Sequence, residues 1–362
     1  MGGLFKADIF SVSRPIFSPV PEHTDRVIRD VSRIFYPGSM SSIDRIEQFG
    51  GNEINSNNFK LQTADGSYLL KRLPEKTDVQ LRRRQLSLMI WLNEKGGAVP
   101  RVVRNKSGEG IVASQDGSHW CLFDFVDGDF FKGGEQELLS TAFEIGRLQR
   151  ALSTLPDSLK LPKKWDYGTA SDAEAFRAAS AGKQEWPKIF GKETSVFLSE
   201  NWDLVLRVSQ ELEEKNTQIQ SAPVGMCHCD LHPHNILMNN GKLSAFIDFE
   251  SFTLMPVSAS LGYAGYKLIK QHTVSQGFSE TFPDRIFDAA QRFLNGVHEG
   301  GGSASFDLET FRLLALAELF RRLLIVFRLN FVEGNNEWNH VLPMHLAGLG
   351  EIDIIFGRHT RA

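Results

Sequence analysis

Residues 228–250 read HCDLHPHNILMNNGKLSAFIDFE, and this stretch decides how the rest of the chain is interpreted. It gathers histidines, acidic residues and asparagines, and Cys227 and Cys229 flank its first histidine. Two interpretations compete. The first is a cluster of His and Cys ligands around a soft metal ion, and the second is a loop that works through Asp230, Asn235 and Asp248.

The spacing of the acidic and amide side chains favours the second interpretation. Asp230 and Asn235 lie five positions apart, and Asp248 follows 13 positions after Asn235. The turn signal Asn240-Gly241 predicts a hairpin between them, which would bring Asp248 back beside Asn235. Carboxylate and amide oxygens are ligands that Mg²⁺ prefers. A site for a hard metal ion is therefore expected.

The zinc alternative has weaker support. One C-x-C pair with nearby histidines has no second C-x₂-C or H-x₃₋₅-H pair elsewhere in the sequence. It also leaves the spacing to Asp248 unexplained. Cys227 and Cys229 are expected to be small buried residues on a strand that enters the loop.

The surrounding sequence predicts an α+β protein of two lobes. Residues 1–42 are expected to form an irregular arm and a short helix. Residues 43–127 alternate strands with one helix and form a smaller β-rich lobe, whereas residues 128–362 form a larger, mainly helical lobe with a small β insert. A cleft between lobes is a common site for a small ligand.

The motifs carry a family resemblance. HCDLHPHN resembles the H-x-D-x-x-x-x-N catalytic loop of protein-kinase-like enzymes, and FIDFE resembles their metal-binding D-F-G segment with Glu250 in place of glycine. Together they resemble the aminoglycoside phosphotransferase, choline kinase and homoserine kinase superfamily more than protein kinases. The resemblance implies a bilobal protein-kinase-like fold and the use of ATP and Mg²⁺. It makes Asp230 the catalytic base, and Asn235 and Asp248 the Mg²⁺ ligands.

The same resemblance assigns the nucleotide site to the first lobe. Lys71 stands on a strand whose alternation turns it inward with Leu69 and Leu73, so it is expected to pair with the α- and β-phosphates, in preference to Arg72. A polar loop is expected to cover the phosphates, and the strand that links the lobes is expected to bind adenine. The residues proposed for these contacts are Asn55, Ser56 and Asn57 in the loop, and Asp124, Phe125 and Val126 in the linking strand.

Two positions depart from the family pattern. Many relatives place a glutamate on the helix after the lysine strand, where this chain has Gln85. Many also place an aspartate some ten residues after D-F-E, where this chain has Ser260. Neither departure removes a metal ligand, so an active enzyme is expected. A nucleotide-binding pseudokinase scaffold is the alternative.

Composition limits the partners. The formal net charge of -4 and pI of about 6.2 give no general attraction to nucleic acid or membrane, and no apolar run is long enough for a span. An odd count of 3 cysteines suits a reducing, cytoplasmic location. The expected partner is a small molecule with a hydroxyl group. A sugar or amino sugar (from Gln149 in FEIGRLQRAL), choline (from an aromatic cage at Tyr263 or Trp338), homoserine and an aminoglycoside all remain open, as does the oligomeric state.

Overall fold

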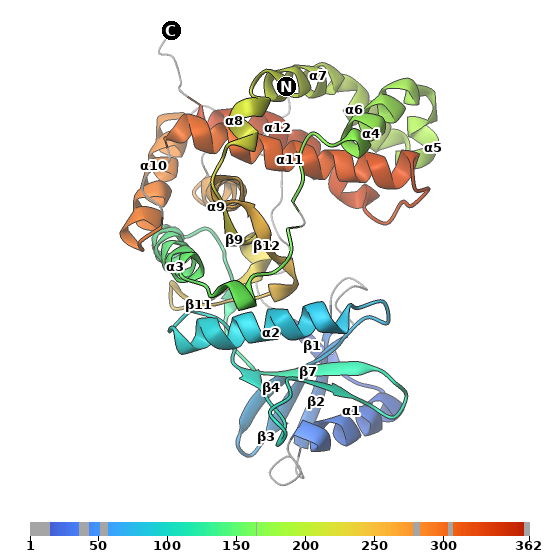
Figure 1. Ribbon diagram of the computed structural model, residues 1–362, viewed down its shortest axis with the longest axis vertical. Helices are drawn as coiled ribbons and strands as arrows, with labels where there is room; N and C mark the ends of the chain where they lie inside the picture. The colour runs from blue at the N-terminus through green and yellow to red at the C-terminus, as the bar shows by residue number, and fades with distance from the viewer. Residues whose placement is uncertain are drawn as a thin grey trace.

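The computed structural model describes residues 15–35, 43–50, 57–163, 165–277, 283–302 and 307–357. Its smaller lobe is built on one antiparallel sheet in the order β1-β2-β3-β4-β7-β5, with β6 paired to β7 (Figure 1). The strands are β1 (Ile16–Pro19), β2 (Ile43–Gly50), β3 (Asn58–Thr63), β4 (Gly66–Arg72), β5 (Val102–Val103), β6 (Ile111–Ala113) and β7 (His119–Asp124).

One helix covers each face of this sheet. Helix α1 (Glu22–Phe35) packs on the outer face, where its residues Ile28 and Val31 share a core with Trp120 and Leu122 of β7. Helix α2 (Val79–Glu94) packs on the inner face, in the core that contains Cys121. Successive residues of β7 belong to different cores, because side chains along a strand point alternately to its two faces. The inner face is therefore the one turned toward the second lobe (Figure 1).

The N-terminal segment contributes more structure than an irregular arm. Residues Ile16–Pro19 form β1, which pairs antiparallel with β2, and α1 completes the outer core of the sheet. Both elements therefore pack onto the lobe that was expected to start at residue 43. The division of the chain at residues 42 and 127 remains a prediction.

The larger lobe is mainly helical. Helix α11 packs against α9, α12 and α4, and its residues from Leu313 to Leu319 are all buried. The helices of this lobe are α3 (Glu135–Ser153), α4 (Ala170–Ala181), α5 (Trp186–Phe190), α6 (Lys192–Glu200), α7 (Trp202–Glu214), α8 (Asn216–Gln220), α9 (Val257–Ser275), α10 (Pro283–Glu299), α11 (Leu308–Phe331) and α12 (Leu342–Phe356). Within the described ranges, no helix is long and apolar enough to cross a membrane.

A small β insert carries the quoted stretch. Strand β10 (Ile236–Asn239) pairs with β11 (Lys242–Phe246) and with β8 (Asp129–Phe130), while β9 (Val224–His228) pairs with β12 (Phe252–Pro256). Asn240 and Gly241 both have positive φ, at 50° and 73°, as a tight hairpin turn requires. The predicted hairpin is therefore present. It faces the smaller lobe, because the amide of Phe246 donates to the carbonyl of Ala98 at 2.9 Å.

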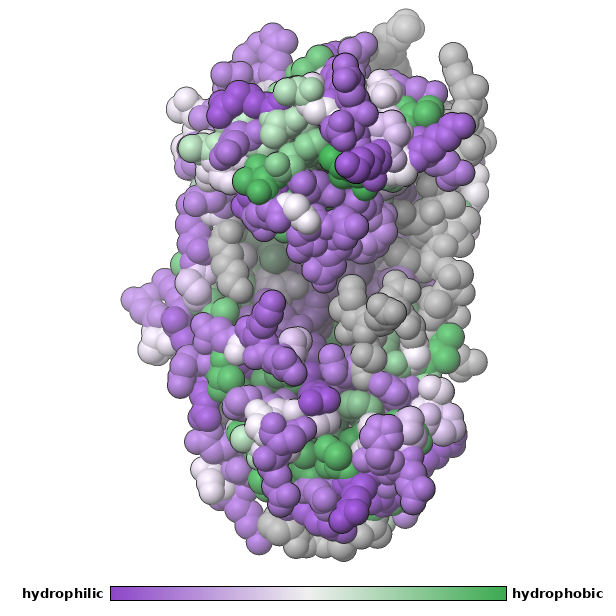
Figure 2. Space-filling model, turned by 90° about the vertical axis from the view of Figure 1, so that its right-hand side faces the viewer, coloured by the Kyte–Doolittle hydropathy of each residue, from purple (hydrophilic) through white to green (hydrophobic). Residues whose placement is uncertain are grey.

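The two lobes meet around a recessed region. Figure 2 shows the surface hollowed between its upper and lower parts, with hydrophilic residues around the hollow. Helix α2 lies between the sheet and the helical lobe, and it contacts the segment Phe249–Ser251 (Figure 1). The end of the quoted stretch is thus placed against α2, on the side of the sheet's inner face.

Candidate active site

His228 holds the start of the loop. It is the last residue of β9 and is buried against the rings of Phe249 and Phe252. Its Nδ1 accepts from the amide of Asp230 at 3.3 Å, so its Nε2 carries the proton that is donated to the carbonyl of Ile247 at 2.9 Å. Burial lowers the pKa of His228, in keeping with a neutral ring. These contacts orient the loop on both sides of Asp230.

Asn235 and Asp248 are brought together as their spacing predicts. The Nδ2 of Asn235 donates to the carbonyl of Asp230 at 2.8 Å, and the carbonyl of Asn235 accepts from the amide of Ile247 at 3.0 Å. Its side-chain Oδ1 accepts from no residue that the structure describes. Asp248 has φ 66°, ψ 61°, a left-handed conformation that few residues other than glycine adopt. Strained backbone of this kind is frequent at functional sites.

The carboxyls of Asp248 and Glu250 form a close pair. Burial, followed by the effect of Glu250, raises the pKa of Asp248 to about 7, although Lys71 acts in the opposite direction. Burial would also raise the pKa of Glu250, but the charges of Lys71 and Arg82 outweigh burial and lower this pKa to about 2. Two carboxyls this close share a proton unless a cation lies between them. With the Oδ1 of Asn235, they provide the hard oxygen donors that suit Mg²⁺.

Lys71 points to this pair from the smaller lobe. Its register partner on β7 is Cys121 of the inner core, and its Nζ lies 2.5 Å from the Oε1 of Glu250. Arg72 lies on the outer face, stacked on Trp120 with its guanidinium 5.7 Å from the ring centre. The preference for Lys71 over Arg72 thus agrees with the geometry.

Two side chains of the helix after the lysine strand, Arg82 and Gln85, contact Glu250. The Nη2 of Arg82 lies 2.5 Å from the same Oε1 of Glu250, and Gln85 donates to the main-chain carbonyl of Glu250 at 3.1 Å. The carboxylate that pairs with Lys71 therefore comes from Glu250 of the D-F-E segment. The Gln85 departure is compensated at a position that sequence comparison alone did not indicate.

The three residues proposed to bind adenine differ in whether their main-chain amide is free to donate a hydrogen bond. The amides of Asp124 and Phe125 already donate to the carbonyls of Arg101 and Ser67, at 2.9 and 3.0 Å. The carboxylate of Asp124 accepts two hydrogen bonds from Arg101. The amide of Val126 donates to no residue in the described part of the chain. Val126 is therefore the one of the three with a main-chain donor left for a base.

The loop proposed for the phosphates is only partly described. Asn55 and Ser56 lie outside the described residues. Asn57 accepts through its carbonyl from the amide of Arg72 at 2.8 Å, which fixes the place where the loop rejoins the sheet. The assignment of these three residues to the phosphates stays a prediction.

Asp230 forms an ion pair that the sequence did not predict. The Nη1 of Arg322, on α11, lies 2.9 Å from the Oδ1 of Asp230, and its Nη2 donates to the carbonyl of Cys229 at 2.6 Å. The Oδ2 of Asp230 faces the ring of His232 at 3.6 Å. Burial would raise the pKa of Asp230, but Arg322 and then His232 outweigh it and hold the pKa at about 2. Asp230 is thus ionised and held from one side.

Arg322 is itself held in place. Its Nε donates to Glu318 at 2.8 Å, and its guanidinium stacks on the ring of Tyr263 at 3.9 Å. Glu318 is fully buried and also accepts from Arg321 and from the indole of Trp165. Ser260, the second departure, donates to the carbonyl of His228 at 3.0 Å. It therefore supports the loop where relatives use an aspartate.

Comparison with known proteins agrees with this geometry. Residues 45–314 match the model of the phosphotransferase enzyme family (APH). The chain belongs to this family. The predicted family is thereby confirmed, and the family is one of enzymes that transfer phosphoryl groups.

Relatives of this chain include homoserine kinases. It is 25% identical over 196 residues to the homoserine kinase of Chelativorans sp. strain BNC1, covering 54% of this chain and 55% of that protein. It is 26% identical over 197 residues to that of Methylocella silvestris, covering 54% and 56%. The chain thus spans about half the length of the curated relatives it matches.

Solved structures confirm the fold. Spectinomycin phosphotransferase APH(9)-Ia, in complex with ADP and spectinomycin, superposes on this chain with a TM-score of 0.64 at 14% identity, covering 94% of this chain and 98% of that one. The choline kinase of Streptococcus pneumoniae gives a TM-score of 0.53 at 13% identity, covering 91% and 99%. The expected bilobal, protein-kinase-like α+β fold is therefore present.

The thiols beside the loop are unsuited to binding metal. Cys227 is fully buried, with its Sγ 3.8 Å from the Oε1 of Gln149, and Cys229 donates to the carbonyl of Ser251 at 2.7 Å. Burial raises the pKa of Cys229 to about 12, whereas a metal ligand must be a thiolate. In the described part of the chain, no three His, Cys, Asp or Glu residues are placed to hold a metal ion together. The zinc interpretation therefore gains no support.

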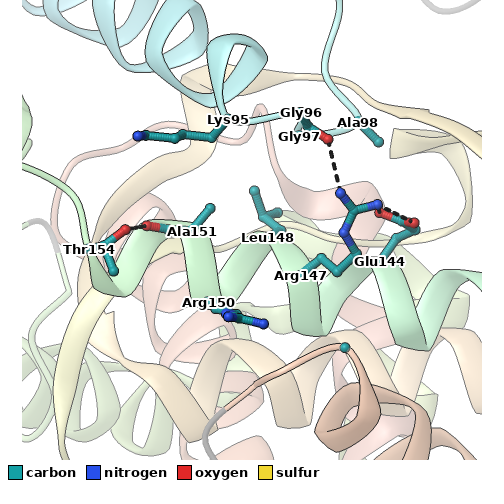
Figure 3. A pocket seen from close by; sticks show the side chains of 11 residues that line it. Lys95, Gly96, Gly97, Ala98, Glu144, Arg147, Leu148, Arg150, Ala151 and Thr154 are labelled. Carbon is teal, nitrogen blue, oxygen red and sulfur yellow. Dashed lines mark hydrogen bonds and ion pairs between the residues drawn. The ribbon is translucent and has the colours of Figure 1, made fainter.

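A separate cavity of about 290 Å³ lies between the loop after α2 and helix α3 (Figure 3). The side chains of Lys95, Arg147 and Arg150 line it, and none of the residues assigned to the candidate active site does. Arg147 crosses from α3 to the carbonyl of Gly96 at 3.4 Å while pairing with Glu144 (Figure 3). Arg147 therefore connects the two lobes.

Proposed function

We propose that the protein transfers the γ-phosphate of ATP to a hydroxyl group of a small molecule. The observation that carries the proposal is the convergence of Lys71 from the first lobe with Asn235, Asp248 and Asp230 from the second. Each of these residue types matches a requirement of phosphoryl transfer: a cation for the phosphates, oxygen ligands for a metal ion, and a carboxylate for the acceptor hydroxyl.

In this proposal Asp230 orients the acceptor hydroxyl and receives its proton. A carboxylate with a pKa of about 2 is a weak base. Phosphoryl transfer tolerates this, because its loose transition state develops little need for early proton removal. Arg322 occupies the Oδ1 of Asp230, so Oδ2 is the atom left to accept from a substrate.

Asn235, Asp248 and Glu250 would hold Mg²⁺. The metal ion, when bound, would neutralise the charge that develops on the phosphates. Lys71 would contact the α- and β-phosphates, and the amide of Val126 would donate to the base. The protein's contribution is then mainly positioning and electrostatic stabilisation.

The charges behind Asp230 favour an acceptor that carries an anionic group. Burial lowers the pKa of His345 far below its usual value, and the cations Lys267, Arg322 and Arg321 lower it further, while the anion Asp230 opposes them. Lys267 also faces Glu351, which pairs with Lys270 at 2.9 Å, so with Glu318 included four cations face three anions. A polycationic aminoglycoside would be repelled by this surplus, whereas a carboxylate would be attracted.

Choline fits this site less well. A quaternary amine is bound by the open faces of aromatic rings. The face of Tyr263 carries the guanidinium of Arg322 at 3.9 Å, and Trp338 is 47% exposed and stacks on His340. We therefore propose an amino alcohol with a carboxylate, of the homoserine class, as the first substrate to test. A neutral sugar is the second.

The test is an ADP-release assay across homoserine, hexoses, amino sugars, choline, ethanolamine and aminoglycosides, with Asp230→Asn as the control for background hydrolysis. The expected result is Mg²⁺-dependent turnover that is fastest with homoserine-like acceptors and lost in the control. Fastest turnover with an aminoglycoside would contradict the charge argument. Tight ATP binding with no turnover on any acceptor would favour the pseudokinase alternative.

A further inference from the structure

The phosphate side of the site contains a cation for which the proposed function has no role. Arg82 lies on the first turns of α2 and is only 8% exposed. Its Nη2 and the Nζ of Lys71 both lie 2.5 Å from one oxygen of Glu250. A planar guanidinium and an ammonium group thus converge on a single carboxylate oxygen, on the side of the sheet's inner face.

This arginine is not fully satisfied by the protein. Its Nε is buried and has no hydrogen-bond partner among the described residues. A buried donor without a partner is costly, and each such case in a folded protein requires an explanation. The buried Cys121 lies within reach of the charges of Arg82, Lys71 and Glu250 together. Two cations face the carboxylate of Glu250 at this point, and the carboxyl of Asp248 lies beside it.

We propose that Arg82 is a second phosphate-binding cation, which contacts the α- and β-phosphates of a nucleotide together with Lys71. This inference rests on the proposed function. Arginine is well suited to the task, because its fork of five N–H donors matches two phosphate oxygens at once. In this structure the carboxylate of Glu250 holds the two cations side by side.

Glu250 has an alternative use for its negative charge. It lies beside Asp248, so its carboxylate can turn toward the metal ion that Asp248 is proposed to hold. Arg82 and Lys71 would then face the phosphates without an internal anion between them. A glutamate at Gln85 would have remained on the helix and neutralised Lys71. The arginine on α2 and the glutamate in the D-F-E segment therefore form one arrangement.

The competing explanation is that Arg82 only neutralises Glu250. The two explanations differ in a double-mutant cycle with nucleotide affinity as the readout. Isothermal titration calorimetry would measure binding of ADP and of adenosine to the wild type, Arg82→Met, Glu250→Gln and the double variant. Arg83→Met is the matched control, since Arg83 is the next residue on α2 but is exposed and pairs with Glu109.

A direct phosphate contact predicts that Arg82→Met weakens ADP binding by about tenfold to a hundredfold, the range for a hydrogen bond to a charged group. Adenosine binding should be unchanged, and the loss of ADP affinity should persist when Glu250 is already glutamine. Arg83→Met should bind ADP like the wild type. The ADP affinity of Arg82→Lys should lie between those of the wild type and Arg82→Met. Arg82→Lys replaces Arg82→Met in the test if the methionine variant does not fold.

The inference is overturned if Arg82→Met weakens the binding of ADP and of adenosine equally. It is also overturned if Arg82→Met no longer lowers ADP affinity when Glu250 is already glutamine. It is also overturned if Arg82→Met or a folded Arg82→Lys binds ADP as tightly as the wild type. A wild-type protein that binds no nucleotide would instead overturn the proposed function itself. The two failures are therefore distinguishable.

Discussion

The substitution Arg322→Met tests whether the ion pair at Asp230 serves catalysis. Arg322 contacts Asp230, Glu318, the carbonyl of Cys229 and the ring of Tyr263. Methionine fills much of the same space but removes all of the donors. Asp230 would lose the contact that fixes its Oδ1, while Glu318 would keep Arg321.

The size of the effect on stability follows from burial. Breaking a buried ion pair costs about 3–5 kcal/mol. The side chain of Asp230 is 27% exposed and can be partly solvated, so the lower end, about 3 kcal/mol, is expected. With an unfolding entropy near 2.1 cal/mol/K per residue and 362 residues, the melting temperature should fall by about 4 °C.

The effect on catalysis should exceed what instability explains. A misplaced carboxylate lowers kcat by about tenfold to a hundredfold, with a smaller change in KM for ATP. The assay is steady-state ADP release at a temperature well below both melting temperatures. Arg321→Met is the control, because Arg321 also pairs with Glu318 but has no contact with Asp230 in the described structure. If Arg322→Met loses the expected stability yet retains kcat within about twofold, the positioning argument is refuted.

Three further predictions follow from the site and the core. Asp230→Asn should lower kcat by roughly a thousandfold while ATP affinity by calorimetry changes little, since the proton acceptor acts in the chemical step; near-normal turnover would remove Asp230 from the mechanism. Asp248→Asn should raise the Mg²⁺ concentration for half-maximal activity and leave metal-free ADP binding intact, and an unchanged Mg²⁺ titration would exclude it as a ligand. Burial lowers the pKa of His272 and of His345 below the ordinary 6.5, so the unfolded chain takes up protons at a higher pH than the folded chain does. The free energy of unfolding should therefore be highest above pH 6.5 and fall toward pH 5. Each histidine accounts for a loss of at most about 1.4 kcal/mol for every unit by which its pKa is lowered. Urea midpoints at pH 7.5 and 5 measure this, and His345→Asn should show a smaller difference; equal midpoints for the wild type would contradict it.

Local spacing was sufficient to predict which residues of the candidate active site lie together. The hairpin about Asn240-Gly241 returns the chain so that Ile247 bonds Asn235, and the strand alternation of β4 places Lys71 inward. These relations act over a few residues, and a periodic backbone fixes them. The roles assigned to the residues remain predictions, but their juxtaposition needed no tertiary information.

The contacts that tune the site could not be predicted in the same way. Arg322 lies 92 positions from Asp230, and no local pattern connects them. Helix α9 was not predicted, because every residue from Val257 to Lys270 is buried and an apolar stripe is therefore absent. Helices α6 and α7 are separated at Asn201, whose side chain donates to the carbonyl of Phe197 at 2.8 Å. Long-range packing decided each case.

The two departures from the family pattern have a common consequence. A glutamate on α2 would have tied Lys71 to its own lobe. Here Lys71 and Arg82 bind Glu250 of the other lobe, and Gln85 donates to the carbonyl of that same residue. Glu250 is two residues from Asp248, so the contact between the lobes and the proposed metal site share one short segment. A change in the carboxylate of Glu250 must therefore alter both the relative position of the lobes and the charge presented to the phosphates. Residues 248–250, more than the histidines and cysteines that first draw attention in the sequence, are thus the segment where the contact between the lobes meets the proposed metal site.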